Sequence, residues 1–188
     1  MMVELLATVK GDQTLLQYLP ALEKEYRYWM EGAATLKKGQ AFKRVVSLPD
    51  EAILNRYWDE ANTPRPESYR EDVETANRST RPKVNVYAHL RAGAASGWDF
   101  SSRWLADGKT LSTIETTNII PVDLNSLLVG FENALARSYK VAGQDSISMV
   151  YTAAAEKRQQ AIEKYCWSRE QQFYTDYNFK KQALTKQI

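Results

Sequence analysis

Apolar residues recur at helical spacing along most of this chain. Leu22, Tyr26 and Trp29 stand at positions i, i+4 and i+7, so they share one face of a helix. Pro20 suits the first turn of that helix, because the first turn does not use the N–H that proline lacks. Gly32 suits its end. The pattern predicts a helix between Pro20 and Gly32 with its apolar face turned inward.

Two longer amphipathic stretches follow in the second half of the chain. In residues 122–143 the apolar positions form one stripe, made of Leu124, Leu127, Leu128, Phe131, Leu135 and Tyr139. Gly143 is expected to close this helix. Residues 146–165 repeat the design, with a face made of Ile147, Val150, Tyr151, Ala154, Ala161 and Ile162. Both stretches predict long helices.

Two shorter stretches also predict helix. Residues 84–95 place Val86 and Leu90 on one face, and their small residues permit close packing before Gly97 ends the helix. The first residues, Met1 to Lys10, resemble the middle of a helix and lack the basic start, apolar run and cleavage site of a signal peptide. We therefore expect this chain to begin inside a larger protein, which leaves its compartment open.

The remaining segments are typical of connections. Residues 39–62 predict extended backbone with at most a turn or two of helix, because apolar pairs at i, i+4 are few there. Residues 63–72 contain two prolines, and Ser68 with Glu71 matches the S-x-x-E capping box of a following helix. Residues 167–177 predict a short hairpin. Together the pattern predicts an all-α fold of antiparallel helix pairs, with functional-looking residues in the connections.

Composition narrows the expected partners. Lys and Arg number 25 against 23 Asp and Glu, and the basic residues are scattered. The formal net charge of +2 therefore gives no reason to expect nucleic acid or an anionic membrane surface as a partner. A membrane span is also not expected, because the chain has no run of about eighteen apolar residues.

The single cysteine and the single histidine predict structural roles. One cysteine permits no internal disulfide and no multi-cysteine metal site, and Cys166 is expected to be a half-buried thiol beside Trp167. His89 is expected to be a surface or packing residue. Glycine-rich phosphate loops, zinc-ligand spacings and G-x-S-x-G elbows do not occur, so no metal or other cofactor is expected.

Candidate chemistry gathers in the stretch RAGAASGWDFSSRW, residues 91–104. A small-residue helical run stops at Gly97, and Trp98, Asp99 and Phe100 follow at once. Aromatic rings stack on sugar faces, and a partly apolar cleft suits a carboxyl group that acts as a general acid. An Asp that only caps a turn is the alternative. These residues alone favour the capping role, because a catalytic acid needs a partner carboxylate.

A second candidate lies in TPRPESYRED, residues 63–72, where prolines stiffen the backbone around Arg65. Arg65 and Glu67 are held close together in this lead-in to a helix. They could bind sugar hydroxyls through charge-assisted hydrogen bonds, or they could pair with each other at the surface. The residues alone do not favour the first alternative over the second.

Several separated motifs resemble one family. RAGAASGWDFSSRW, with NRYWDEANTPRPESYREDVETA before it and TTNIIPVDLNSLL after it, closely resembles the central part of the trehalase family of glycoside hydrolases. KEYRYWMEG near the start and IEKYCWSREQQFYTDYN near the end extend the resemblance through essentially the whole chain. The order of these motifs makes the resemblance specific.

The resemblance implies a fold and an activity. The fold is an (α/α)6 barrel, or toroid, in which helical hairpins form two concentric rings. This chain would cover about half of it as part of one catalytic domain, residues 1–188, without an internal domain boundary. The activity is inverting hydrolysis of α,α-trehalose to two glucose molecules, which makes trehalose the expected partner. A half ring would expose apolar inner faces that the missing helices should cover.

The resemblance also implies roles for individual residues. Asp99 matches the family's catalytic acid, while Arg65, Pro66, Glu67 and Gly97 match substrate-binding positions. The family's PGGRF and QWDxPxGW motifs and its C-terminal glycine-rich segment do not occur in this chain. The general base, a Glu, lies in the family downstream of the last residue here, so these residues alone are expected to be inactive. A noncatalytic carbohydrate-binding module and a helical interaction module remain the alternatives.

Overall fold

A computed structural model describes residues 2–186, so Met1 of the predicted first helix and residues 187–188 lie outside the described part. The described part contains six α-helices: α1 Met2–Lys10, α2 Gln13–Trp29, α3 Tyr69–Asn77, α4 Lys83–Ala95, α5 Val122–Val141 and α6 Asp145–Cys166. Its short strands are β1 Ala41–Phe42, β2 Val45–Ser47, β3 Ile53–Asn55, β4 Ile119–Ile120, β5 Trp167–Ser168, β6 Phe173–Tyr174, β7 Tyr177–Asn178 and β8 Ala183–Leu184. The chain is mostly helical, as predicted.

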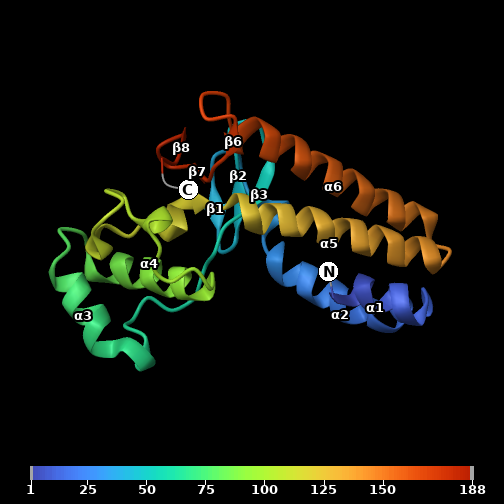
Figure 1. The fold of residues 1–188 in the computed structure, drawn as a ribbon, viewed down its shortest axis with the longest axis horizontal. Coiled ribbons are helices and arrows are strands. Elements are labelled where there is room, and N and C mark those ends of the chain that lie inside the picture. Colours follow the sequence, from blue (N-terminus) through green and yellow to red (C-terminus); the bar gives the residue numbers. More distant parts are fainter. Residues whose placement is uncertain (1, 187–188) are drawn as a thin grey trace.

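The helices form two groups on either side of a small sheet (Figure 1). Helices α5 and α6 run side by side, α2 packs on α5, and α1 packs on α2. Helices α3 and α4 lie together in the other group. This arrangement confirms helix pairing, but these residues do not display the closed ring that the resemblance implies.

The predicted helix ends are largely confirmed, with one error. Gly32 follows α2 in a left-handed conformation, with φ at 83°, and a Cβ there would lie 2.4 Å from Phe42 Cδ1. Only glycine fits this close approach without displacement of the Phe42 ring. Pro20, in contrast, lies inside α2 rather than in its first turn, because the helix already begins at Gln13.

The predicted stripe of α5 is buried, with the exception of Leu127. Helix α5 packs its stripe against Leu22 of α2 in a cluster that contains Leu124, Leu128, Phe131 and Leu135. Leu127 is 64% exposed. It lies about 100° around the helix from Leu128, on a side that neither α2 nor α6 covers.

The predicted face of α6 is correct near its C-terminal end and at Tyr151, whose ring stacks on that of Tyr139 with centroids 5.5 Å apart. Ala161 and Ile162 are buried, whereas Ile147 and Val150 are 39% and 64% exposed. The early turns of α6 instead approach α5 through a small polar residue, because the Ser148 hydroxyl donates to the Ala136 carbonyl at 2.8 Å. The aliphatic residues Ile147 and Val150 and the thioether of Met149 consequently face solvent.

Small sheets are the main departure from the predicted all-α fold. Strands β1, β2 and β3 form an antiparallel sheet, with Val45 opposite Asn55 and Val46 opposite Leu54, where a mainly extended connection was predicted. The few i, i+4 apolar pairs of this segment do not form helix. Residues 167–177 do form the predicted hairpin, through β5 and β6, and β4, β7 and β8 make a third sheet.

Three apolar clusters hold these elements together. One lies between the β1–β3 sheet and the C-terminal half of α6, and one lies between α2 and α5. The third packs α4 onto the following loops around Trp104, which is completely buried. No helix in the described part is both long and apolar enough to cross a membrane.

Candidate functional site

The stretch that carries Asp99 leaves the C-terminal end of α4, as predicted. Gly97 adopts a left-handed conformation there, with φ at 74°, and ends the helix. The Phe100 ring then packs back on Gly93, where a Cβ would lie 3.0 Å from Phe100 Cε1. Asp99, which lies between Gly97 and Phe100 in the sequence, is exposed. We call residues 96–101 the Trp98–Asp99 loop.

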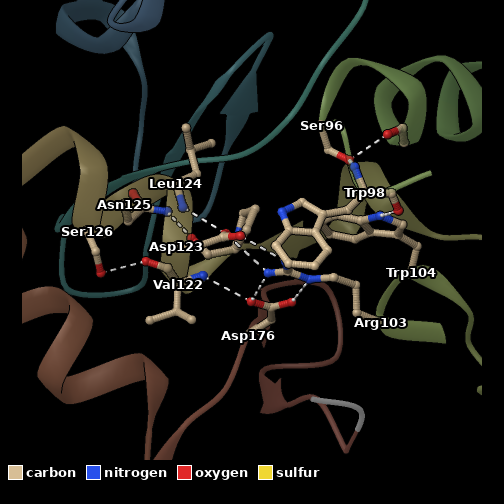
Figure 2. A network of polar contacts seen from close by, with 12 residues as sticks. Ser96, Trp98, Arg103, Trp104, Val122, Asp123, Leu124, Asn125, Ser126 and Asp176 are labelled. Carbon is tan, nitrogen blue, oxygen red and sulfur yellow. Dashed lines mark hydrogen bonds and ion pairs between the residues drawn. The ribbon is translucent and has the colours of Figure 1, made fainter. Parts of the chain in front are cut away.

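The main chain of the Trp98–Asp99 loop is fixed by side chains (Figure 2). The Trp98 N–H donates to Ser96 Oγ at 3.0 Å, and the Ser96 hydroxyl donates to the Gly93 carbonyl at 2.5 Å. The Trp98 carbonyl accepts a hydrogen bond from Trp104 Nε1 at 3.0 Å. Because Trp104 is buried, the peptide group that leads into Asp99 is tied to the core.

Arg103 links this loop to two distant segments (Figure 2). Its guanidinium donates to the Asp123 carboxylate at 2.9 and 3.2 Å and to the Asp176 carboxylate at 2.9 and 2.8 Å. Burial opposes the charge of Arg103, but the hydrogen bonds that it donates to Asp176 and Asp123 outweigh this effect and raise the Arg103 pKa. The guanidinium also lies 5.3 Å from the ring centroid of Trp98.

Arg65 lies next to the Trp98–Asp99 loop. Its guanidinium carbon is 4.9 Å from the ring centroid of Phe100. Hydrogen bonding to Asp72 raises the Arg65 pKa, and the nearby charges of Glu67 and Asp99 add to that effect. The fold therefore brings the two candidate segments of the sequence together.

Arg65 pairs with Asp72, so the predicted pairing of Arg65 with Glu67 is wrong. Arg65 is buried and donates to Asp72 from Nη2 at 2.7 Å, from Nε at 3.1 Å and from its main-chain N–H at 2.9 Å. Glu67 makes no such pair and, like Pro66, is exposed. Ser68 does stand at the N-cap of α3, but its side chain makes no capping hydrogen bond.

The sequence patterns assigned no functional role to three carboxylates that pair with Arg65 or Arg103. Asp72 follows Arg65 by seven residues, across the start of a helix, and Asp123 begins α5. Asp176 is 73 residues from Arg103. Spacing to an acidic residue was a usable signal only for Asp72.

Tyr57 completes the surroundings of Arg103. Its ring packs edge-on against Trp104, with centroids 6.1 Å apart, and against Trp29 at 6.4 Å. Burial raises the Tyr57 pKa to about 12, and the charge of Asp123 adds to this effect. The phenol therefore stays protonated at neutral pH.

Cys166 and His89 have packing roles. Burial raises the Cys166 pKa to about 12, so its thiol stays protonated and is a poor nucleophile. The thiol is fully buried rather than half-buried as predicted. Burial lowers the His89 pKa to about 3, and its Nδ1 accepts a hydrogen bond from the Thr117 N–H at 3.2 Å. Between residues 2 and 186, no three His, Cys, Asp or Glu side chains gather as metal ligands.

A surface cavity of about 510 Å³ adjoins the Arg103 network. Asp123 lines it, together with Phe173 and Tyr174 of β6 and with Gln159 and Glu163 of α6. Exposed aromatic rings beside hydrogen-bonding side chains suit the faces and hydroxyls of a sugar.

Comparisons with known proteins place the sequence. The family model described as Trehalase matches residues 1–188. The periplasmic trehalase of Escherichia coli O139:H28 is 51% identical over 189 residues, which cover 100% of this chain and 34% of that protein. The periplasmic trehalase of Citrobacter koseri is 52% identical over 188 residues, which cover 100% of this chain and 33% of that protein. The chain thus spans about a third of the length of these relatives, and it belongs to the trehalase family.

Proposed function

We propose that these residues are part of an enzyme that hydrolyses α,α-trehalose to two glucose molecules with inversion, and that Asp99 is its general acid. The observation that carries this proposal is the position of Asp99. Its carboxyl group is exposed at the end of α4, between Trp98 and Phe100 and close to the Arg65 guanidinium. This arrangement occurs in a chain that belongs to the trehalase family.

The proposed chemistry needs two carboxyl groups. Asp99, protonated when substrate binds, gives its proton to the glycosidic oxygen while the bond from that oxygen to the anomeric carbon breaks. A carboxylate outside these 188 residues takes a proton from water, whose oxygen attacks the anomeric carbon from the opposite face. Inverting enzymes hold these two carboxyl groups roughly 6.5 to 9.5 Å apart, which leaves room for the water. We therefore expect this chain alone to be inactive.

We assign substrate binding to Arg65, Pro66, Glu67 and Gly97. Asp72 occupies Nε and Nη2 of Arg65, and within residues 2–186 no acceptor bonds its Nη1, which can donate to a sugar hydroxyl. The exposed Glu67 carboxylate can accept from hydroxyls, and Pro66 restricts the backbone between the two. Gly97 adds no side chain to the open space next to its own backbone, two residues before Asp99.

We infer that the complete fold is an (α/α)6 toroid, of which this chain supplies about half as part of one domain. Large apolar side chains on α1, α5 and α6 support this proposal, because they lie in solvent here: Met2, Leu5, Val9, Leu127, Met149 and Val150. Further helices of a ring would cover faces of this kind.

The test is Asp99→Asn in the full-length protein that contains these residues. Asn keeps the shape of the side chain but cannot donate a carboxyl proton, so trehalose turnover should fall by roughly 10²- to 10⁴-fold. Asp145→Asn is the matched control, because within residues 2–186 Asp145 forms only an exposed ion pair with Lys140. Circular dichroism should show the same helix content in both variants. Turnover in Asp99→Asn near that of the control removes Asp99 from the mechanism.

The aromatic cavity beside Asp123 favours one second function, a noncatalytic carbohydrate-binding module. In that case calorimetry on the 188-residue chain should detect trehalose binding, and Phe173→Ala, which removes an exposed ring from the cavity, should weaken it. A chain that binds no trehalose but forms a stable oligomer would point instead to a helical interaction module. Absence of heat on trehalose addition counts against the binding module.

A further inference from the structure

We propose that Arg103 is a positioning residue for the Trp98–Asp99 loop. Its guanidinium is fixed by Asp123 and Asp176 and holds the Trp98 indole. In this way Arg103 sets the direction in which the Asp99 carboxyl group points. This inference rests on the proposed role of Asp99 as the acid. It adds a residue that acts through Trp98 and takes no part in proton transfer itself.

The first step is that Arg103 cannot turn freely. Its side chain is 12% exposed and makes four hydrogen bonds to two carboxylates. Asp176 is only 4% exposed and also accepts from the Val122 N–H at 3.0 Å. Asp123 also accepts from the Leu124 N–H at 2.8 Å. Rotation of Arg103 would leave a buried carboxylate without its charged partner, which is strongly unfavourable.

The second step is that Trp98 depends on this fixed guanidinium. Trp98 is 52% exposed, so packing against other side chains covers only about half of it. The Arg103 guanidinium carbon lies 5.3 Å from the Trp98 ring centroid and 4.6 Å from that of Trp104. Both distances are within the range of cation–π attraction, which is about 6 Å. Figure 2 shows the Trp98 indole beside Arg103, at the edge of the carboxylate network.

The third step is that Asp99 takes its direction from Trp98. Among residues 2–186, no hydrogen-bond donor fixes the exposed Asp99 carboxylate, and the nearby Arg65 charge acts on it without a hydrogen bond, so its place follows mainly from the backbone on either side. On the N-terminal side that backbone is held at the Trp98 N–H and carbonyl, and the Trp98 side chain is held by Arg103. A catalytic group displaced by about 1 Å can lose about 10²-fold in rate.

The structural half of the proposal is tested in the 188-residue chain labelled with 5-fluorotryptophan. Each of the five tryptophans should give its own fluorine NMR signal, and Trp98→Phe should identify the signal of Trp98. Arg103→Lys keeps the charge but loses the planar fork and the ring contact. It should move the Trp98 signal toward that of a solvent-exposed indole. Arg91→Lys is the matched control, since Arg91 donates to the single carboxylate of Asp59 and its guanidinium makes no cation–π contact with a tryptophan in the described part of the chain.

A further variant guards against loss of folding. Arg103→Met combined with Asp123→Asn and Asp176→Asn removes the guanidinium together with the charges that it neutralises. It should keep the helix content and still move the Trp98 signal. If the Trp98 signal stays in place in both this variant and Arg103→Lys, Arg103 does not hold the loop and the proposal is wrong.

The catalytic half is tested by kinetics in the full-length protein. Arg103→Lys should lower kcat about tenfold or more and leave KM within about threefold, because a misdirected acid slows proton transfer without changing sugar contacts. A rise in KM with unchanged kcat overturns the positioning role. Normal turnover in Asp99→Asn would instead overturn the proposed function. That result would leave the fluorine spectra unchanged, so the two failures are distinguishable.

Discussion

Two arginine networks in this molecule use similar chemistry in different surroundings. Arg158 of α6 pairs with Glu132 of α5, with side chains 3% and 1% exposed. Arg103 pairs with Asp123 and Asp176, whose side chains are 32% and 4% exposed. The first network lies inside the helix group, whereas the second borders an exposed loop.

The partners of the two arginines also differ. Arg158 donates to Glu132 and to the side-chain oxygens of Asn55 and Asn125, at distances between 2.8 and 3.1 Å. These bonds join α5 and α6 to β3, and Tyr26 of α2 donates to the same Glu132 at 2.9 Å. Arg103 instead contacts aromatic rings that lead to Asp99. We therefore expect the Arg158 network to govern the stability of the fold and the Arg103 network to govern the position of the Trp98–Asp99 loop.

The largest expected effect comes from a substitution that breaks the buried network of Arg158 and Glu132. Arg158→Ala leaves the Glu132 charge buried without its partner, so the free energy of unfolding should fall by about 3 to 5 kcal/mol. Urea unfolding followed by circular dichroism measures the change. Removing both members, as in Arg158→Met with Glu132→Leu, should recover much of the loss. A loss below about 1 kcal/mol in Arg158→Ala would show that the network does not govern stability.

The next effect concerns pH and lies in the other group of helices. Burial lowers the folded-state pKa of His89 to about 3, below its ordinary value of 6.5. The unfolded chain therefore binds the proton more readily, and the stability due to neutral His89 is present above pH 6.5 and lost as the pH falls toward 3. Within that window the slope should approach about 1.4 kcal/mol per pH unit. Urea unfolding at several pH values measures it, and His89→Gln should flatten the curve.

The same two regions show what the sequence could predict. Helix α5 was predictable because its apolar stripe is long and Gly143, with φ at 71°, ends it where expected. The β1–β3 sheet was not predictable, because strands of two or three residues are too short to show an alternating pattern. Val46 and Leu54 are buried there by contact with the distant Ile162 of α6, which no local pattern records.

The site residues were likewise predictable where the signal is local, and not where it depends on contacts between distant segments. The motif around Asp99 and the Arg65 segment were identified by residue type and order, and the structure places them side by side. The carboxylates that hold the arginines were not identified, because Asp176 meets Arg103 across 73 residues. Such pairs depend on how helices and loops pack. The resemblance to a family carried the roles of individual residues, and those roles stay predictions.

The smallest expected effect concerns Gly97, where a substitution should affect stability but not the position of Trp98. Gly97→Ala puts a side chain at φ of 74°, a strained conformation for any residue with a Cβ, but that Cβ would meet no atom within 4 Å. Stability should therefore fall by only about 1 to 2 kcal/mol. Gly93→Ala is the matched comparison, because its conformation is helical but its Cβ would lie 3.0 Å from the Phe100 ring. Gly97→Ala should keep the Trp98 fluorine signal in place, since the Arg103 contact is untouched, whereas Gly93→Ala should shift the loop through Phe100. A larger shift of the Trp98 signal in Gly97→Ala than in Gly93→Ala would mean that the turn at Gly97, and not the side chains around it, sets the direction in which the Asp99 carboxyl group points.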